Sequence, residues 1–340
     1  MKINRTAKPL VSIVMASYMH SEFIEEAIRS VVNQSFENWE LVITDDASSD
    51  ATVEVIRSIP DRRIRLNVLQ VNVGGSAALN DAVLRSRGSL IAVLNSDDVF
   101  TSERLSEQVE IFRQNPNINV LFGCPSFIDH FSQPLLDYPS PFISPDGGHP
   151  KSTTEWLRFF FDNGNALCHP TLIMRRSVYQ TIGLYDPRLA QVPDLDMWIR
   201  TSIRYTIHLT NQVVTKFRIL NDSKNASAFR ADTVTRDLWE RAKVLRHYLK
   251  LSDNALARIF PEITFDKEEF KVNFFKFVLE RPQLYYKQFA LEGWYQTLGA
   301  NHLAFNSPKL DKEIQPSYID FINQTGSEDI HQLRTRLYAL

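Results

Sequence analysis

Residues 90–100 read Leu-Ile-Ala-Val-Leu-Asn-Ser-Asp-Asp-Val-Phe, an apolar run that ends abruptly in polar residues. An unbroken apolar run is typical of a strand that is buried on both faces of a sheet. Asp97 and Asp98 follow the run, and adjacent carboxylates at a buried strand end repel each other and lose hydration. A divalent cation would remove that cost, so the stretch indicates a metal site. The simpler interpretation is a turn followed by a helix cap.

The same pattern of an apolar strand and a polar loop occurs twice earlier in the chain. Residues 10–16 and 39–44 are apolar, and they end at Ser17-Tyr18 and Asp45-Asp46. Segments with helical spacing of apolar residues separate the strands, at 21–32, 51–58 and 76–86. Strand–helix alternation with short connections predicts an α/β fold with a doubly wound, mostly parallel sheet. In such a sheet the three polar loops converge on the edge where ligands bind.

These loops offer the groups that a nucleotide requires, which are contacts for a base, acceptors for ribose hydroxyls and carboxylates for a cation. The glycines at 74–75 form neither a dinucleotide fingerprint nor a phosphate-binding P-loop. A dehydrogenase is therefore disfavoured. A nucleotidyltransferase would normally carry a glycine-rich, basic loop near its N-terminus, and residues 10–25 lack one.

Bulk properties narrow the classes of partner. The 340-residue chain has a formal net charge of −2 and no basic cluster that resembles a nucleic-acid motif, so no nucleic-acid partner is expected. Cys124 and Cys168 form no metal or redox spacing and suit a reducing compartment. No apolar stretch is long enough to span a bilayer, and the N-terminal apolar run looks like a strand, not a signal peptide. We expect a cytoplasmic protein and leave peripheral membrane contact open.

The character of the chain changes after residue 225, which predicts a first domain over 1–225 and a helical C-terminal extension over 226–340. Helical spacing is found over 232–250, 270–279, 284–298 and near 330–340. Aromatic side chains crowd this region and predict a helical core. The alternative is a surface helix on a membrane or a lipid-linked acceptor, supported by the basic residues Arg236, Arg241, Lys243, Arg246 and Lys250.

Three motifs together resemble the family 2 glycosyltransferases of the GT-A fold. They are residues 12–18 (SIVMASY), 45–50 (DDASSD) and 95–98 (NSDD), and the resemblance covers about residues 8–220. It implies the nucleotide-diphospho-sugar transferase fold and an inverting transfer of a sugar from a nucleotide diphosphate sugar, with Mn²⁺ or Mg²⁺. The long-synthase motif Gln-x-x-Arg-Trp and transmembrane helices are absent, so a processive synthase is not favoured.

The resemblance also assigns expected roles to individual residues. It places Asp46 at the base, and it places Ala16, Ser17, Tyr18, Asn80, Ser96 and Asp97 in the donor site. Asp97 and Asp98 match the metal and ribose carboxylates, and the sequence does not decide which does which. Asp194 aligns with the catalytic base, with His169 as the second candidate, although acids at a helix start are often only caps.

The sequence departs from the family pattern at three positions. Asn95 stands where Asp is common, Leu79 where Arg is frequent, and Pro193 where Glu usually precedes the base. These departures put one ribose or metal contact and one phosphate contact in doubt. They leave open a second class of function, a non-catalytic nucleotide-sugar binding or partner-recognition module.

The leading expectation is an enzyme that adds one sugar to a glycan or lipid-linked acceptor in cell-surface polysaccharide or lipopolysaccharide synthesis. A uridine donor is favoured, because a carboxylate at Asp46 accepts an imide N–H, which uracil and thymine offer and cytosine lacks. The donor sugar, the acceptor, the linkage and the oligomeric state are not determined by the sequence.

Overall fold

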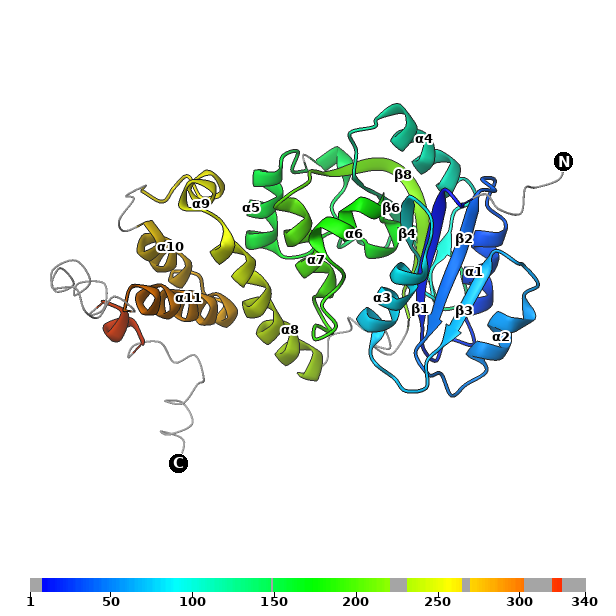
Figure 1. Ribbon diagram of the computed structural model, residues 1–340, viewed down its shortest axis with the longest axis horizontal. Coiled ribbons are helices and arrows are strands. Elements are labelled where there is room, and N and C mark those ends of the chain that lie inside the picture. The colour runs from blue at the N-terminus through cyan, green and yellow to red at the C-terminus, as the bar shows by residue number, and fades with distance from the viewer. Residues whose placement is uncertain (1–7, 148, 221–230, 265–269, 303–319, 326–340) are drawn as a thin grey trace. The chain divides into compact units, whose positions relative to one another are not determined.

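The computed structural model describes residues 8–147, 149–220, 231–264, 270–302 and 320–325 (Figure 1). The chain divides into two compact units, Met1–Arg230 and Ala231–Leu340. The predicted domain boundary at 225–226 and the predicted helix near 330–340 lie outside the described residues. Within the described part of the chain, no helix has both the length and the apolar character needed to cross a bilayer.

The first unit is built on one eight-stranded sheet in the order β3-β2-β1-β4-β7-β6-β8-β5. Its strands are β1 (Val11–Ser17), β2 (Trp39–Asp45), β3 (Ile64–Val68), β4 (Leu90–Val93), β5 (Val99–Phe100), β6 (Val120–Ile128), β7 (Ile173–Arg175) and β8 (Ile207–Arg218). Strands β3, β2, β1 and β4 run parallel, as do β6 and β8. The expected α/β, mostly parallel sheet is confirmed.

Two antiparallel strands complete the sheet around the expected metal loop. Strand β7 lies between β4 and β6 and is antiparallel to both. Strand β5, which the sequence pattern did not predict, follows Asp98 directly and pairs with β8 through Val99 opposite Lys216. The loop that contains Asp97 and Asp98 therefore lies between the C-terminal end of β4 and the C-terminal end of β8.

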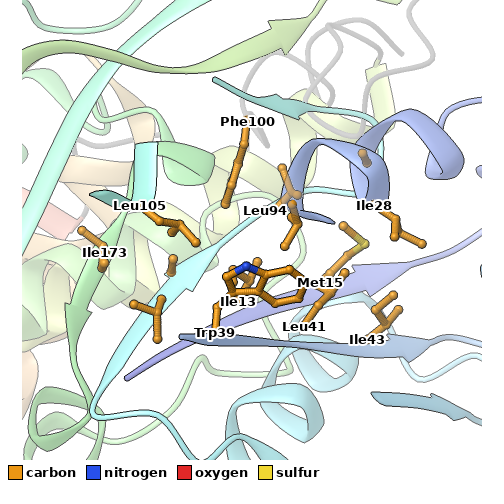
Figure 2. Close-up of a cluster of buried hydrophobic side chains, with 14 of the residues drawn as sticks. Ile13, Met15, Ile28, Trp39, Leu41, Ile43, Leu94, Phe100, Leu105 and Ile173 are labelled. Atoms are coloured by element: carbon orange, nitrogen blue, oxygen red, sulfur yellow. The ribbon is translucent and has the colours of Figure 1, made fainter. Parts of the chain in front are cut away.

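Helices cover the sheet because its central strands are apolar on both faces. The helices of this unit are α1 (Ile24–Val32), α2 (Thr52–Ser58), α3 (Gly75–Arg85), α4 (Arg104–Gln114), α5 (Thr153–Asn163), α6 (Arg176–Ile182) and α7 (Pro193–Ser202), with short 3₁₀ turns at Pro145–Gly147 and His169–Thr171. Alternate residues of each strand face the same side. Ile13, Leu41 and Ile43 thus pack with Ile28 of α1 and Leu105 of α4 in one core cluster (Figure 2).

The second unit is helical and has its own aromatic core. It contains α8 (Ala231–Val244), a 3₁₀ helix (Leu245–Lys250), α9 (Asp253–Ile259), α10 (Phe270–Leu279) and α11 (Leu284–His302). Most of the crowded aromatic side chains are buried, which confirms the core interpretation for Phe270, Phe274, Phe275, Tyr286, Phe289 and Trp294. Three of the basic residues are engaged in ion pairs, since Arg241 pairs with Asp237 while Lys243 and Arg246 pair with Glu292.

A close approach of backbones fixes how β4 begins. Gly88 lies against Ser12 of β1, and its backbone N–H donates to the Ser12 hydroxyl at 2.7 Å. A Cβ atom at Gly88 would lie 2.6 Å from the Ser12 backbone nitrogen and 2.8 Å from the Val11 carbonyl carbon. Both neighbours are backbone atoms of a central strand, so neither can move without disturbing the sheet.

We therefore expect Gly88→Ala to lower the free energy of unfolding by about 1–3 kcal/mol or more, because the added methyl group overpacks the sheet. Chemical denaturation followed by circular dichroism measures this change. Gly75→Ala is the matched control, because a Cβ atom there meets nothing within 4 Å. Equal stability of the Gly88→Ala and Gly75→Ala variants would contradict the close approach.

Candidate active site

The carboxyl ends of β1, β2 and β4 meet at one edge of the sheet. Ser17 at the end of β1 lies opposite Asp45 at the end of β2, and the two strands run parallel. The backbone N–H of Asp46 donates to the Ser17 carbonyl at 2.8 Å. His20 Nδ1 lies 2.7 Å from the Ser96 hydroxyl, which joins the loop after β1 to the loop after β4. The predicted convergence of three polar loops is therefore present.

Asp45 and Asp46 are adjacent carboxylates with separate tasks. Asp45 is fully buried and accepts hydrogen bonds from the Ser17 hydroxyl at 2.9 Å and the Ser48 hydroxyl at 2.7 Å. The carboxylate of Asp46 instead accepts the backbone N–H groups of Val73 at 2.7 Å and Gly74 at 2.9 Å. Each Asp46 oxygen keeps acceptor capacity beyond its bond to one of these amides, because a carboxylate oxygen accepts more than one hydrogen bond.

The DDASSD motif also shapes the loop after β1. The backbone N–H of His20 donates to the Thr52 hydroxyl, and that of Ser21 donates to Asp50. Burial alone would raise the pKa of Asp50, but hydrogen bonds from Thr52 and Ser21 lower it to about 2. Met19 in this loop adopts the left-handed backbone conformation, with a φ of 55°. Left-handed non-glycine residues persist only where the surroundings hold them and are common at binding sites.

Asp97 and Asp98 form a tightly coupled carboxylate pair. Asp98 is almost fully buried, and its two oxygens accept the Asn95 amide at 2.9 Å and the Arg218 backbone N–H at 2.8 Å. Burial and then the Asp97 charge raise the pKa of Asp98 well above its ordinary value. Burial also raises the pKa of Asp97, although the charges of His20 and Arg218 partly offset that rise.

Arg218 at the end of β8 supports this pair and was not recognised in the sequence. Its side chain is 1% exposed and donates through Nε to the Asp97 carbonyl at 2.8 Å. Its other nitrogens bind the carbonyls of Asp129 and His130 and the carboxylate of Glu26. An arginine that ends a buried strand was the available signal, because a charge is buried only where it is paired.

The donor set of the carboxylate pair fits a hard divalent cation. Neighbouring carboxylates with raised pKa values gain from a cation, and oxygen ligands suit Mg²⁺ and Mn²⁺. Within the described ranges, no group of three or more His, Cys, Asp or Glu residues could hold a metal ion. Asp97 and Asp98 would thus be the acidic ligands, and the remaining positions would fall to water and to a bound phosphate, as is usual for Mg²⁺.

Asp194 lies in the first turn of α7, where it is directed by a residue that sequence reasoning missed. The amide of Asn165 donates to Asp194 Oδ2 at 2.5 Å, and the Leu195 backbone N–H donates to Oδ1 at 2.7 Å. The N-cap of α7 is Val192, so Asp194 is not the cap itself, although it does bind one first-turn amide. Pro193 occupies the first helical position, where the missing N–H of proline costs nothing.

His169, the second candidate base, belongs to a buried hydrogen-bonded group. Its Nε2 lies 2.8 Å from the Tyr185 hydroxyl. Burial lowers the pKa of His169 to about 4, so the imidazole is neutral at pH 7. Burial raises the pKa of the Tyr185 hydroxyl, and the neighbouring Tyr179 hydroxyl at 3.4 Å adds to that rise.

The segment 168–172 connects α7 with the end of β4. The ring of Trp198 on α7 lies 5.7 Å from the ring of His169. The backbone N–H of Val93, at the end of β4, donates to the Leu172 carbonyl at 3.1 Å. Burial raises the pKa of the Cys168 thiol in this segment well above its ordinary value, and the charge of Asp98 adds to the rise. The helix that carries Asp194 is therefore connected through this segment to the strand that precedes the carboxylate pair.

Asn80 and Leu79 differ from the simplest expectation. The Asn80 side chain donates to the Tyr185 carbonyl at 2.7 Å and accepts the Tyr185 backbone N–H at 3.0 Å. Its expected contact with a donor stays a prediction. Leu79, at the position where the family often has arginine, is buried on α3, so its side chain is part of the core.

The chain matches the model of glycosyl transferase family 2 over residues 12–183. It is 28% identical over 250 residues to the putative teichuronic acid biosynthesis glycosyltransferase TuaG of Bacillus subtilis, a match that covers 72% of this chain and 92% of TuaG. It is 38% identical over 114 residues to the UDP-Glc:alpha-D-GlcNAc-diphosphoundecaprenol beta-1,3-glucosyltransferase WfgD of Escherichia coli, covering 34% of this chain and 45% of WfgD.

The fold is shared with a solved structure, residues 1–349 of S. aureus TarS in complex with UDP-GlcNAc. That structure superposes with a TM-score of 0.56 at 17% identity and covers 84% of this chain and 92% of TarS 1–349. The family match spans half of the chain and includes all three polar loops at the edge of the sheet. The chain belongs to glycosyl transferase family 2.

Proposed function

We propose that this protein is an inverting, metal-dependent glycosyltransferase that moves a sugar from a UDP-sugar to a hydroxyl of a glycan or lipid-linked acceptor. The observation that carries the proposal is the meeting of Asp46 and the Asp97-Asp98 pair at one sheet edge, with Asp194 on α7, the helix that the segment 168–172 connects to β4. Each supplies a group that the transfer needs, namely a base contact, cation ligands and a proton acceptor. Polysaccharide synthesis is the proposed process, since TuaG and WfgD are named for teichuronic acid biosynthesis and for glucosyl transfer to a lipid diphosphate.

The donor's uracil would lie near Asp46. Val73, whose backbone N–H binds this carboxylate, is 45% exposed, and Tyr18 in the loop after β1 is 48% exposed, so apolar surface is available for a planar base. The free lone pairs of Asp46 would accept the imide N–H of uracil, while Ala16 and Ser17 line the pocket at the end of β1. WfgD, by its name, uses a UDP-sugar.

The donor's diphosphate and ribose would lie at residues 96–98. Ser96 offers a hydroxyl beside His20, and Asp97 and Asp98 would hold the divalent cation. When bound, the cation supplies positive charge that stabilises the departing diphosphate. Arg218 holds the backbone of Asp97 in place for this purpose, since its Nε binds the Asp97 carbonyl.

Asp194 is the proposed base. In a direct displacement at the anomeric carbon, the acceptor hydroxyl loses its proton as it attacks, on the face opposite the diphosphate. Asp97 and Asp98 are committed to the diphosphate side, so the base comes from a later segment. Asn165 donates to Asp194 and thereby favours its ionised form, which a base requires.

The non-catalytic alternative rested on departures that the structure accounts for. The Asn95 amide donates to Asp98, so it compensates the buried negative charge instead of adding a third carboxylate. Pro193 suits the first position of α7. Neither substitution removes a group that the proposed reaction uses, and this supports the catalytic function over the binding module.

The first test concerns donor and metal together. We expect calorimetry to detect binding of UDP and UDP-sugars that is strengthened by Mn²⁺ or Mg²⁺, and Asp98→Ala to remove the metal-dependent part of the affinity. Asp137→Ala, at an exposed acid, is the matched control. Binding of GDP-sugars without binding of UDP or dTDP, or full transfer in EDTA, would overturn this assignment.

The second test separates catalysis from binding. We expect Asp194→Asn to lower turnover by roughly 10²-fold or more, because the amide keeps the shape but cannot take a proton. Donor affinity should stay within about twofold, since the base does not touch the nucleotide. Turnover near the wild-type rate would mean that Asp194 is only a helix-start residue, and His169→Gln would then be measured next.

The third test uses the pKa of His169. Its folded-state pKa of about 4 lies below the ordinary value of 6.5, so the unfolded chain takes up this proton first. The stability that neutral His169 contributes is therefore complete above pH 6.5 and is lost as the pH falls toward 4. Thermal unfolding of His169→Gln should show a flatter dependence over pH 6.5–4, and identical slopes would contradict burial of a neutral imidazole.

A further inference from the structure

We infer that Asn80 is a positioning residue for Asp194: it clamps the loop 183–192 that leads into α7, and it does not contact the donor. The inference rests on the proposed role of Asp194 as base. It changes the role expected for Asn80 from the family pattern and extends the active site to the loop that precedes α7.

The clamp consists of two hydrogen bonds between one side chain and one backbone position. The Asn80 amide group donates to the Tyr185 carbonyl at 2.7 Å, and its oxygen accepts the Tyr185 N–H at 3.0 Å. Both backbone groups of a loop residue are thus satisfied by a single asparagine. Only a side chain with a donor and an acceptor side by side can do this, which accounts for the amide at position 80.

Further contacts hold the same loop on both sides. From α3, the Ser76 hydroxyl donates to the Leu189 carbonyl at 3.3 Å. From α7, Arg200 donates to the Ile182 carbonyl at 2.6 Å and to the Leu184 carbonyl at 2.8 Å. A loop that is held at several points has few accessible conformations. The position of Asp194, which lies just after the loop, is therefore restricted as well.

The loop is also joined to the buried group beside the site. The Tyr185 hydroxyl contacts His169 Nε2 at 2.8 Å, so the Tyr185 backbone is held by α3 and its side chain by the segment 169–171. At its other end, α3 starts next to Val73 and Gly74, the two amides that Asp46 binds. Helix α3 therefore connects the Val73–Gly74 backbone, which binds Asp46, with Asn80, which holds the loop before Asp194.

This placement has a chemical consequence. A proton acceptor must lie within hydrogen-bond reach of the attacking hydroxyl, and a misplacement of about 1 Å can lower turnover by about 10²-fold. Loss of the clamp should displace Asp194 without changing the nucleotide pocket. A direct donor contact by Asn80 would have the opposite signature, with weaker donor binding.

The experiment uses the full-length protein with Asn80→Ala and, as the milder change, Asn80→Asp, which keeps the acceptor for the Tyr185 N–H. Asn163→Ala is the control, since Asn163 is exposed at the end of α5 and its amide donates to the Phe159 carbonyl of its own helix. Turnover is measured as UDP-glucose and UDP-GlcNAc hydrolysis, affinity as UDP binding with Mn²⁺, and loop order as amide hydrogen exchange over residues 183–192.

We expect Asn80→Ala to lower kcat by about 10-fold to 10²-fold, with the UDP dissociation constant within about twofold of wild type. Exchange over residues 183–192 should be faster in Asn80→Ala, intermediate in Asn80→Asp and unchanged in Asn163→Ala. In the Asp194→Asn background, Asn80→Ala should cause no further fall in kcat, because Asp194→Asn has already removed the base that Asn80 positions.

Three results would overturn the inference. Weaker UDP binding with unchanged kcat would make Asn80 a donor contact. Additive losses in the double variant would make its effect independent of Asp194, and unchanged exchange over 183–192 would show that the loop does not depend on it. Wild-type turnover of Asp194→Asn alone would instead refute the proposed base, while the exchange data would still decide whether Asn80 holds the loop.

Discussion

The placement of two like charges side by side, with Asp98 buried and Asp97 partly buried, is the constraint on which the rest of the site depends. Adjacent carboxylates that lose water cost free energy, and here burial raises the pKa of both. The protein offsets this cost only in part, through the Asn95 amide and the backbone and charge of Arg218. The remaining deficit is the cost that the proposed divalent cation would remove.

Arg218 shows how far along the chain that compensation reaches. A buried guanidinium must itself be satisfied, and its nitrogens bind the Asp97 carbonyl, the turn at Asp129 and His130, and the carboxylate of Glu26 on α1. The loop after β4, the turn after β6 and the first helix are thereby held by one side chain from β8. The antiparallel pairing of β5 with β8 is what brings this arginine to the carboxylate pair.

Neighbouring polar residues at this edge of the sheet have different roles: one holds the loops in place, and the other is available to bind a ligand. Asp45 is buried and bound by Ser17 and Ser48, so it fixes loops, whereas Asp46 faces the 73–74 peptide and keeps lone pairs for a ligand. Asn165 and Asn80 make a comparable division around the helix of Asp194. One orients the carboxylate, and the other holds the loop that precedes it. A motif can mark such residues, as it did Asp45 and Asn80, but it does not show which neighbours they hold.

The sequence by itself determined the α/β class, the alternation of strands β1 to β4 with helices α1 to α3, and the loops at 17–20, 45–50 and 95–98. Each of these depends on local periodicity and on the rule that parallel strands end at one edge. Only the tertiary structure decided strand β5, the roles of Arg218 and Asn165, and the partner of Asn80. The reason is physical: each of these joins residues far apart in the chain, Arg218 to Asp98 and Asn80 to Tyr185. No local pattern encodes such a pairing, because it is set by how the sheet and its helices pack.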